Sequence, residues 1–275
     1  MSQSVSVRPV RGKEDLRAFL DVPFAIYADD PNWVAPLYIE RLEHLDPQRN
    51  PYFRHAEVEL FLAFRGDKPV GRISAQLCRL RSERHADGVG QFGFLEAEND
   101  PAVFSALFEA AGAWLKQRGA TTIQGPFSFS INDETGLLVE GFDTPPMVLM
   151  GHARPYYGQR MEDAGFAKAK DVFAYDLFAS PEIPRALKSA YDKALSDKDV
   201  TLRPLDKKQL LKELRTVVSI ANDAWSENWG FVPWTEEEMA ALANNLKFLV
   251  SGDYIAIAEY KGEPAAMAIT LPNIN

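Results

Sequence analysis

The chain contains an internal repeat, and this repeat limits the fold more than any single motif does. The run NWGFVP, which begins at Asn228, lies 196 residues after NWVAP, which begins at Asn32. The same distance separates Gly66 in AFRGDKPVGRIS from Gly262 in AEYKGEPAAMAI, whereas the prolines that follow these glycines lie 195 residues apart. We therefore expect the second turn to be one residue shorter. A period this long indicates two duplicated domains rather than a solenoid of small units.

The repeat also sets the expected domain boundaries. Asn275 corresponds to Arg79 of the first copy, so the counterpart of residues 80–178 lies outside the printed sequence. We expect the source gene to continue past Asn275, and we expect the open edge of the last strand to favour self-association. The predicted parts are a first domain at residues 1–179, a helical connector at 180–199 and the N-terminal part of a second domain at 200–275.

Periodicity predicts an α/β fold with a mixed sheet (α+β) for each copy. The central helix has clear signals, with Asp100 as N-cap, Pro101 in the first turn and Gly119 as a stop. The expected elements of the first copy are a strand at 4–10, a helix from 13 that Pro23 ends or kinks, a helix at 36–49, a hairpin at 56–80, a strand at 90–98, a helix at 101–118, a strand at 121–129, a helix at 156–164 and a strand at 168–178.

Composition limits the classes of partner and the cellular compartment. The net charge of −9 and the pI near 5.1 argue against nucleic acid or an anionic membrane as the main partner, because both require a basic surface. Cys78 is the single cysteine, so no internal disulfide is expected. The N-terminal sequence lacks the basic and apolar regions of a signal peptide, and we expect a cytoplasmic protein.

Three longer motifs carry a family resemblance. NDAWSENWGFVPWTEEE, GPFSFSINDETGLLVEGFDTPPM and PYYGQRMEDAGF together resemble a bacterial family with two GNAT-like domains in tandem, from the superfamily of acyl-CoA-dependent N-acyltransferases. The resemblance implies an acyltransferase that acts on a small amine-bearing substrate, with acetyl-CoA or another acyl-CoA as co-substrate. No His or Cys spacing indicates a metal.

The superfamily binds the pyrophosphate of CoA at a glycine-rich loop before the central helix, where backbone N–H groups and the helix dipole attract phosphate. In the first copy this position reads EAENDPA. We expect Glu96, Glu98 and Asp100 to repel phosphate, so that the first domain has a degenerate pyrophosphate loop. The resemblance therefore places the expected CoA site in the second domain.

The candidate catalytic residues lie in two segments. The loop SFSINDETGLLVEGFDTPP offers Asn132 for substrate binding and Asp133 and Glu134 as proton acceptors, although an Asx turn with solvated acids would explain the same residues. Tyr157 is the third catalytic candidate, because Met161 occupies the position where the superfamily often has a tyrosine acid. Packing is the alternative for Tyr157, since an unperturbed tyrosine pKa of about 10 is too high for acid chemistry near neutrality.

Further substrate-binding candidates follow the first helix of the second copy. Asn222, Trp225 and Asn228 occupy a region that helps line the acceptor groove in the superfamily, and amide and aromatic groups suit a small polar ligand. Core packing is the alternative for Trp225, which continues an apolar stripe. Trp33 and Trp229 recur in both copies, and we expect them to occupy equivalent positions.

Two functional interpretations remain open. The first is an acyl-CoA-dependent N-acyltransferase with one degenerate and one active GNAT-like domain. The second is a non-catalytic tandem whose fold serves as a ligand-binding or assembly module.

Overall fold

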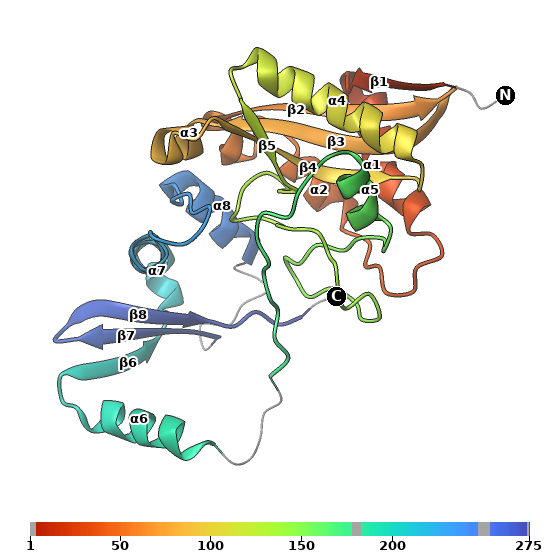
Figure 1. Cartoon of the computed structure of the whole chain (residues 1–275). Helices are drawn as coiled ribbons and strands as arrows, with labels where there is room; N and C mark the ends of the chain where they lie inside the picture. Colours follow the sequence, from red (N-terminus) through yellow and green to blue (C-terminus); the bar gives the residue numbers. More distant parts are fainter. Residues whose placement is uncertain (1–3, 178–182, 247–253, 274) are drawn as a thin grey trace. The chain divides into compact units, whose positions relative to one another are not determined.

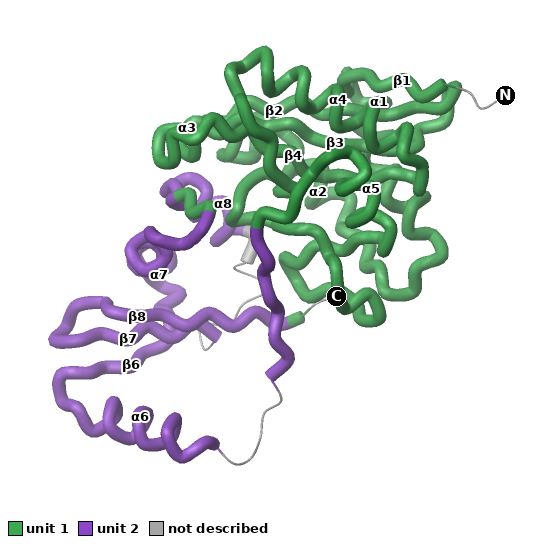
Figure 2. The backbone as a smooth tube through the Cα atoms, viewed as in Figure 1, with its two compact units in different colours: residues 1–169, 230–232, 273–275 green, residues 170–229, 233–272 purple. Residues whose placement is uncertain are grey.

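The chain divides into two compact units, shown in Figure 2. The computed structural model describes residues 4–177, 183–246, 254–273 and 275. The first unit extends to Ala169 and includes Gly230–Val232, and the second unit begins at Lys170. The predicted domain limits at residues 179 and 200 stay a prediction.

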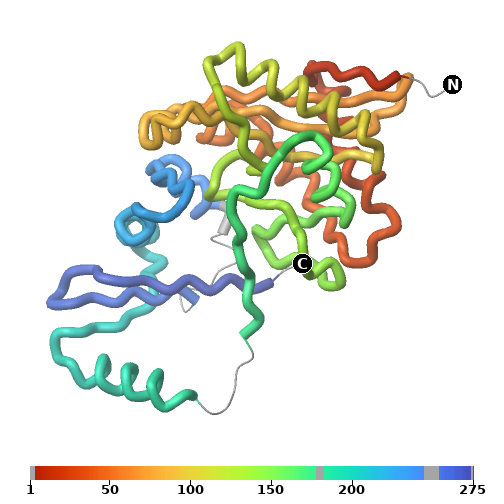
Figure 3. Tube along the Cα trace, viewed as in Figure 1, coloured from red at the N-terminus to blue at the C-terminus, as the bar shows by residue number. Residues whose placement is uncertain are grey.

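The first unit is built on a five-stranded mixed sheet in the order β1-β2-β3-β4-β5. All neighbouring strands are antiparallel except β4 and β5, which are parallel and are joined by the crossover helix α4 (Figure 3). The strands are β1 (Val5–Pro9), β2 (Ala56–Arg65), β3 (Lys68–Cys78), β4 (Val89–Ala97) and β5 (Thr122–Gln124).

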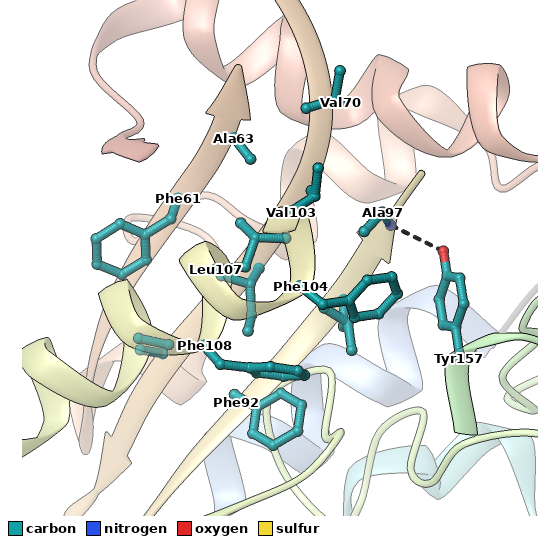
Figure 4. Packing of buried hydrophobic residues seen from close by; sticks show 14 of the residues in the cluster. Phe61, Ala63, Val70, Phe92, Ala97, Val103, Phe104, Leu107, Phe108 and Tyr157 are labelled. Atoms are coloured by element: carbon teal, nitrogen blue, oxygen red, sulfur yellow. Dashed lines mark hydrogen bonds between the residues drawn. The ribbon is translucent and has the colours of Figure 1, made fainter. Parts of the chain in front are cut away.

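Helices cover both faces of this sheet (Figure 1). Alternate β2 residues enter two different cores: Phe61 packs with α4, and Leu62 packs with α1. Figure 4 shows the α4 core, where Phe104 and Leu107 face the strands. The helices are α1 (Gly12–Ile26), α2 (Tyr38–His44), the 3-10 turn η1 (Pro51–Arg54), α3 (Arg79–His85), α4 (Pro101–Gln117) and α5 (Tyr157–Asp163).

The second unit contains a three-stranded antiparallel sheet in the order β6-β7-β8. Its elements are α6 (Arg185–Ser196), β6 (Val200–Pro204), the 3-10 turn η2 (Lys207–Gln209), α7 (Leu210–Ala224), α8 (Glu236–Leu246), β7 (Ile255–Tyr260) and β8 (Glu263–Ile269). The helix α6 lies in the segment that the sequence predicts to be a helical connector.

Strand pairing repeats in the two units with a constant offset. Val5 pairs with Arg65 in the first unit and Val200 pairs with Tyr260 in the second, so both partners move by 195 residues. The irregularity between Ala63 and Phe64 in the β2–β3 ladder recurs 195 residues later in the β7–β8 ladder. This coincidence of register and irregularity supports a duplication.

Four details differ from the sequence predictions. Both hairpin turns have two residues, so the second turn is not shorter; its glycine is displaced by one position, and Lys261 takes a positive φ of 53°. Pro23 lies inside α1 instead of ending it. The strand after α4 has only three residues. No strand forms at residues 168–177, and residue 178 lies outside the described part.

Candidate active site at the β4 bulge

Strand β4 has an irregularity at its centre. Arg72 of β3 pairs with Glu96 but Ser74 pairs with Gly93, so β4 holds one extra residue at this point. Phe94, within the bulge, has a positive φ of 48° although it is buried and is not a glycine. Bulges and strained non-glycine residues concentrate near active sites because they redirect side chains.

Glu96 forms a buried hydrogen-bonded cluster directly after the bulge. Its Oε2 accepts hydrogen bonds from the hydroxyl groups of Tyr27 (2.8 Å) and Tyr157 (2.7 Å). Arg72 lies 3.9 Å from the other carboxylate oxygen, and its NH1 donates to the carbonyl of Phe19 at 3.0 Å. We call Glu96, Arg72, Tyr27 and Tyr157 the Glu96 cluster.

Burial perturbs the titration of this cluster. It raises the pKa of Glu96, against the opposing effects of the Arg72 charge and the two tyrosine hydroxyl groups. It also raises the pKa of Tyr157, and the nearby Glu96 charge adds to this shift. The tyrosines are therefore neutral donors, and Glu96 is a carboxylate with elevated proton affinity.

A second group of charges joins α2 to the loop after β5. Arg41 forms ion pairs with Glu134 and with Glu40, whose oxygen lies 3.3 Å from Arg41 Nε. His44 lies 3.7 Å from Asp133. Burial and then the Arg41 charge lower the pKa of His44 to about 3, so this imidazole is neutral at pH 7. We call these five residues the Arg41 cluster.

The two clusters lie around Phe94 and influence each other. The Arg72 guanidinium is 5.8 Å from the Phe94 ring, and the His44 ring is 5.6 Å from it. The Glu134 charge contributes to the raised pKa of Glu96. Together the clusters hold four carboxyl groups, two arginines and a neutral histidine, a formal charge of −2 when all carboxyl groups are ionised. In that fully ionised state the site favours a cation, whereas burial, which raises the pKa of Glu96 and of Glu40, opposes the ionised state.

The N-terminus of α4 is already occupied by side chains. Asp100 accepts a hydrogen bond from the Ala102 amide at 2.9 Å, and this confirms the predicted N-cap. Glu98 and Asp100 also form ion pairs with Arg65, at 3.0 and 2.5 Å. Glu96, in contrast, belongs to β4 and not to the segment that joins this strand to α4, and its role in repelling phosphate stays a prediction.

The predicted residues of the first unit separate into the two clusters. Asp133 and Glu134 belong to the Arg41 cluster, whereas Tyr157 bonds to Glu96 and accepts from the Ala97 amide at 3.0 Å (Figure 4). Asp133 also accepts from the amide and hydroxyl of Ser130, three residues earlier, which is a local contact but not the Asx turn that the sequence suggested. Asn132 donates to the carbonyl of Val232 at 3.2 Å. Their functional roles stay predictions.

The predicted residues of the second unit lie near the end of α7. Asn222 exchanges two hydrogen bonds with the backbone of Trp234, at 3.0 and 3.3 Å. The Asn228 amide donates to the carbonyl of Trp225, and 46% of the Trp225 residue surface is exposed, so core packing is wrong for this tryptophan. Substrate binding by these residues stays a prediction.

Sequence reasoning missed Arg72, Tyr27 and Arg41. One signal was available: Arg72 and Glu96 are charged residues within two strands that consist mainly of apolar residues. Within the described residues no three His, Cys, Asp or Glu side chains are arranged as a metal site. In the same part of the chain, no helix is both long and apolar enough to span a bilayer.

Comparison with solved structures defines the class of fold. A tandem GNAT protein from the clavulanic acid biosynthesis pathway superposes with a TM-score of 0.50, covering 98% of this chain and 76% of that chain at 12% identity. The α/β fold is thus that of the GNAT acyltransferases, and the resemblance to tandem GNAT-like proteins is confirmed.

Comparison with characterised sequences is more specific. The chain is 48% identical over 274 residues to the bacterial ceramide synthase of Caulobacter vibrioides, which covers 98% of this chain and 71% of that protein. It is 45% identical over 274 residues to protein YghO of Escherichia coli, covering 98% of this chain and 68% of YghO. No family model matches. The chain belongs to the family of these two proteins.

Proposed function

We propose that the protein is an acyl-CoA-dependent N-acyltransferase whose acceptor is a long-chain amino alcohol. A ceramide is the amide of such a base with a fatty acid, and the relative of 48% identity is a ceramide synthase. This substrate class is narrower than the small amine that the motifs imply. The structural support comes from the β4 bulge.

The observation that carries the proposal is the negatively charged site around Phe94. An ammonium group near Glu96 would neutralise part of the excess charge of the two clusters. Burial raises the pKa of Glu96, which makes its carboxylate a stronger proton acceptor than that of an exposed glutamate.

The chemical step uses Glu96 as a general base. The carboxylate takes a proton from the ammonium, and the neutral nitrogen attacks the thioester carbonyl carbon. The C–N bond forms, the C–S bond breaks, and the leaving CoA thiolate takes up the second proton, which the nitrogen loses as the amide forms. Tyr27 and Tyr157 hold the carboxylate in one orientation by donating to the same oxygen.

The position of CoA is a separate part of the proposal. Asp100 and Glu98 occupy the start of α4, so we propose that the pyrophosphate binds away from this helix start, at a place from which the thioester reaches Glu96. A CoA site in the second domain stays a separate prediction from the sequence. The same observation favours the alternative of a non-catalytic tandem.

A cytoplasmic location, self-association and the absence of nucleic-acid partners stay predictions from the sequence.

The test is thiol release from a long-chain acyl-CoA in the presence of a long-chain amino alcohol. We expect turnover by the wild-type protein and a decrease in kcat of about 100-fold or more in Glu96→Gln, which cannot accept the proton. Circular dichroism and thermal melting verify folding. Unchanged kcat in Glu96→Gln would reject the base assignment, and no thiol release by wild type would favour the non-catalytic alternative.

A matched pair of tyrosine variants tests whether the pKa of Glu96 determines the acid limb of the kcat profile. Hydrogen bonds from Tyr27 lower the pKa of Glu96, so Tyr27→Phe should raise it and move the acid limb of the kcat profile to higher pH. Tyr156 donates to the carbonyl of Ala97 and not to Glu96, so Tyr156→Phe should leave that limb in place. Equal displacement in both variants would contradict the assignment.

A further inference from the structure

Two buried side-chain nitrogens of the described residues have no hydrogen-bond partner, and both lie beside the Glu96 cluster. One is Arg72 Nε, and the other is His152 Nδ1. Buried polar atoms are almost always paired, so each exception requires an explanation. His152 has no role in the proposed proton transfer, although its side chain is only 5% exposed.

A carboxylate fixes the tautomer of His152. Its Nε2 lies 3.0 Å from Asp30 Oδ2, and the Asn32 amide donates to the other oxygen of Asp30 at 3.0 Å. Burial raises the pKa of Asp30, but the His152 and Asn32 hydrogen bonds outweigh this and hold it below its usual value. The ionised Asp30 can only accept, so Nε2 is the donor, and in the neutral imidazole the lone pair is then on Nδ1.

His152 adjoins the proposed amine site through Tyr27. The two rings are 5.4 Å apart between centroids. The Tyr27 hydroxyl lies 2.8 Å from Glu96 and 3.4 Å from the carbonyl of His152. The Tyr27 side chain therefore contacts both His152, whose Nδ1 has no partner, and Glu96, the carboxylate that would hold the ammonium.

We propose that His152 is a specificity-determining residue whose Nδ1 accepts a hydrogen bond from a hydroxyl group adjacent to the acceptor amine. The inference rests on the proposed function and narrows its acceptor to amines with a neighbouring hydroxyl. Asp30 is a positioning residue, because it orients the imidazole and places the proton of the neutral ring on Nε2. A site built to pair with a hydroxyl discriminates strongly against the analogue that lacks it.

The test compares two acceptors of equal chain length, a 2-amino-1-alkanol and the corresponding 1-alkylamine, with the same acyl-CoA. For the wild type we expect kcat/KM to be at least about 10-fold higher with the amino alcohol. In His152→Phe we expect kcat/KM for the amino alcohol to fall until the preference disappears. The value of kcat/KM for the alkylamine should stay within about two-fold of the wild type. His85→Phe, outside both clusters, is the matched control and should keep the preference.

The Asp30→Asn variant tests the acceptor role of His152 Nδ1 independently, because it leaves the imidazole in place. The asparagine amide can donate to Nε2, which moves the ring proton to Nδ1 and removes the acceptor. We expect this variant to lose the preference as well. Retention of the preference in His152→Phe, or in Asp30→Asn if the former does not fold, would overturn this inference alone. Absence of turnover with both amines in the wild type would overturn the proposed function and this inference together.

Discussion

Burial acts on Glu96 and His44 in opposite directions for one physical reason. Removal from water penalises the charged form, so the pKa of the acid rises and the pKa of the imidazole falls. A carboxyl group of raised pKa and a histidine that is neutral at pH 7 therefore occur in the two clusters around Phe94.

The depressed pKa of His44 predicts an acid-sensitive fold. The unfolded chain binds the proton with a pKa of 6.5 and the folded protein with one of about 3, so this contribution to stability is full above pH 6.5 and is lost as pH falls toward 3. The slope is at most about 1.4 kcal/mol per pH unit.

Urea denaturation of the wild type and of His44→Gln at pH 6.5 and pH 5 measures this effect. The difference between the two free energies of unfolding should shrink by about 2 kcal/mol on acidification, because only the wild type loses stability through His44. A difference that is equal at both pH values would show that His44 does not titrate in this window.

Single residues also mark the limit of sequence reasoning. Asp100 could be assigned as an N-cap because its partner lies two positions away. The partners of Glu96 could not be assigned from the sequence, because Tyr27, Arg72 and Tyr157 come from distant parts of the chain. Pairings of this kind depend on strand register, which no local spacing encodes.

At the scale of elements, β4 depends on close backbone contact with the segment after β5. A Cβ on Gly93 would lie 1.7 Å from the carbonyl oxygen of Phe127, a backbone atom that cannot turn aside. The amide of Phe127 in turn donates to the carbonyl of Phe92 at 2.7 Å. The bulge therefore requires glycine at position 93.

Two glycine-to-alanine substitutions test this requirement. Gly93→Ala should destabilise the protein by more than about 3 kcal/mol because the backbone must move. Gly112→Ala, in α4 with open space around the added atom, should stabilise it by about 1 kcal/mol through helix propensity. Thermal melting of both variants measures these changes in stability. If Gly93→Ala were as stable as the wild type, the bulge would be able to accommodate a Cβ atom.

Helices and strands with strong local sequence signals were predicted correctly, whereas those with weak signals were not. Alternation in β2 and β3 and the Asp100-Pro101 start of α4 gave correct elements. The segment 121–129 forms only three strand residues, since the chain crosses toward β3, where Gln76 donates to the Phe127 carbonyl at 2.7 Å. Long-range packing here overrides strand propensity.

For the whole molecule, the central question is where acyl-CoA binds. If the pyrophosphate lay at the start of α4, removal of a negative charge there would strengthen binding. Asp100→Asn keeps an N-cap side chain and removes one charge. We expect the Kd for acyl-CoA, measured by titration calorimetry, to change less than about two-fold in this variant. A clearly tighter complex would return the CoA site to the first unit.

The repeated ladders have a consequence for the order of folding. Each hairpin, β2–β3 and β7–β8, closes through a two-residue turn, whereas β1 and β6 must reach partners 60 positions along the chain, as from Val5 to Arg65 and from Val200 to Tyr260. Hairpins form in about 1–10 μs, and long closures are slower. Each copy is therefore expected to begin folding at its own hairpin, β2–β3 or β7–β8. The first strand of each copy, β1 or β6, is expected to join its sheet last.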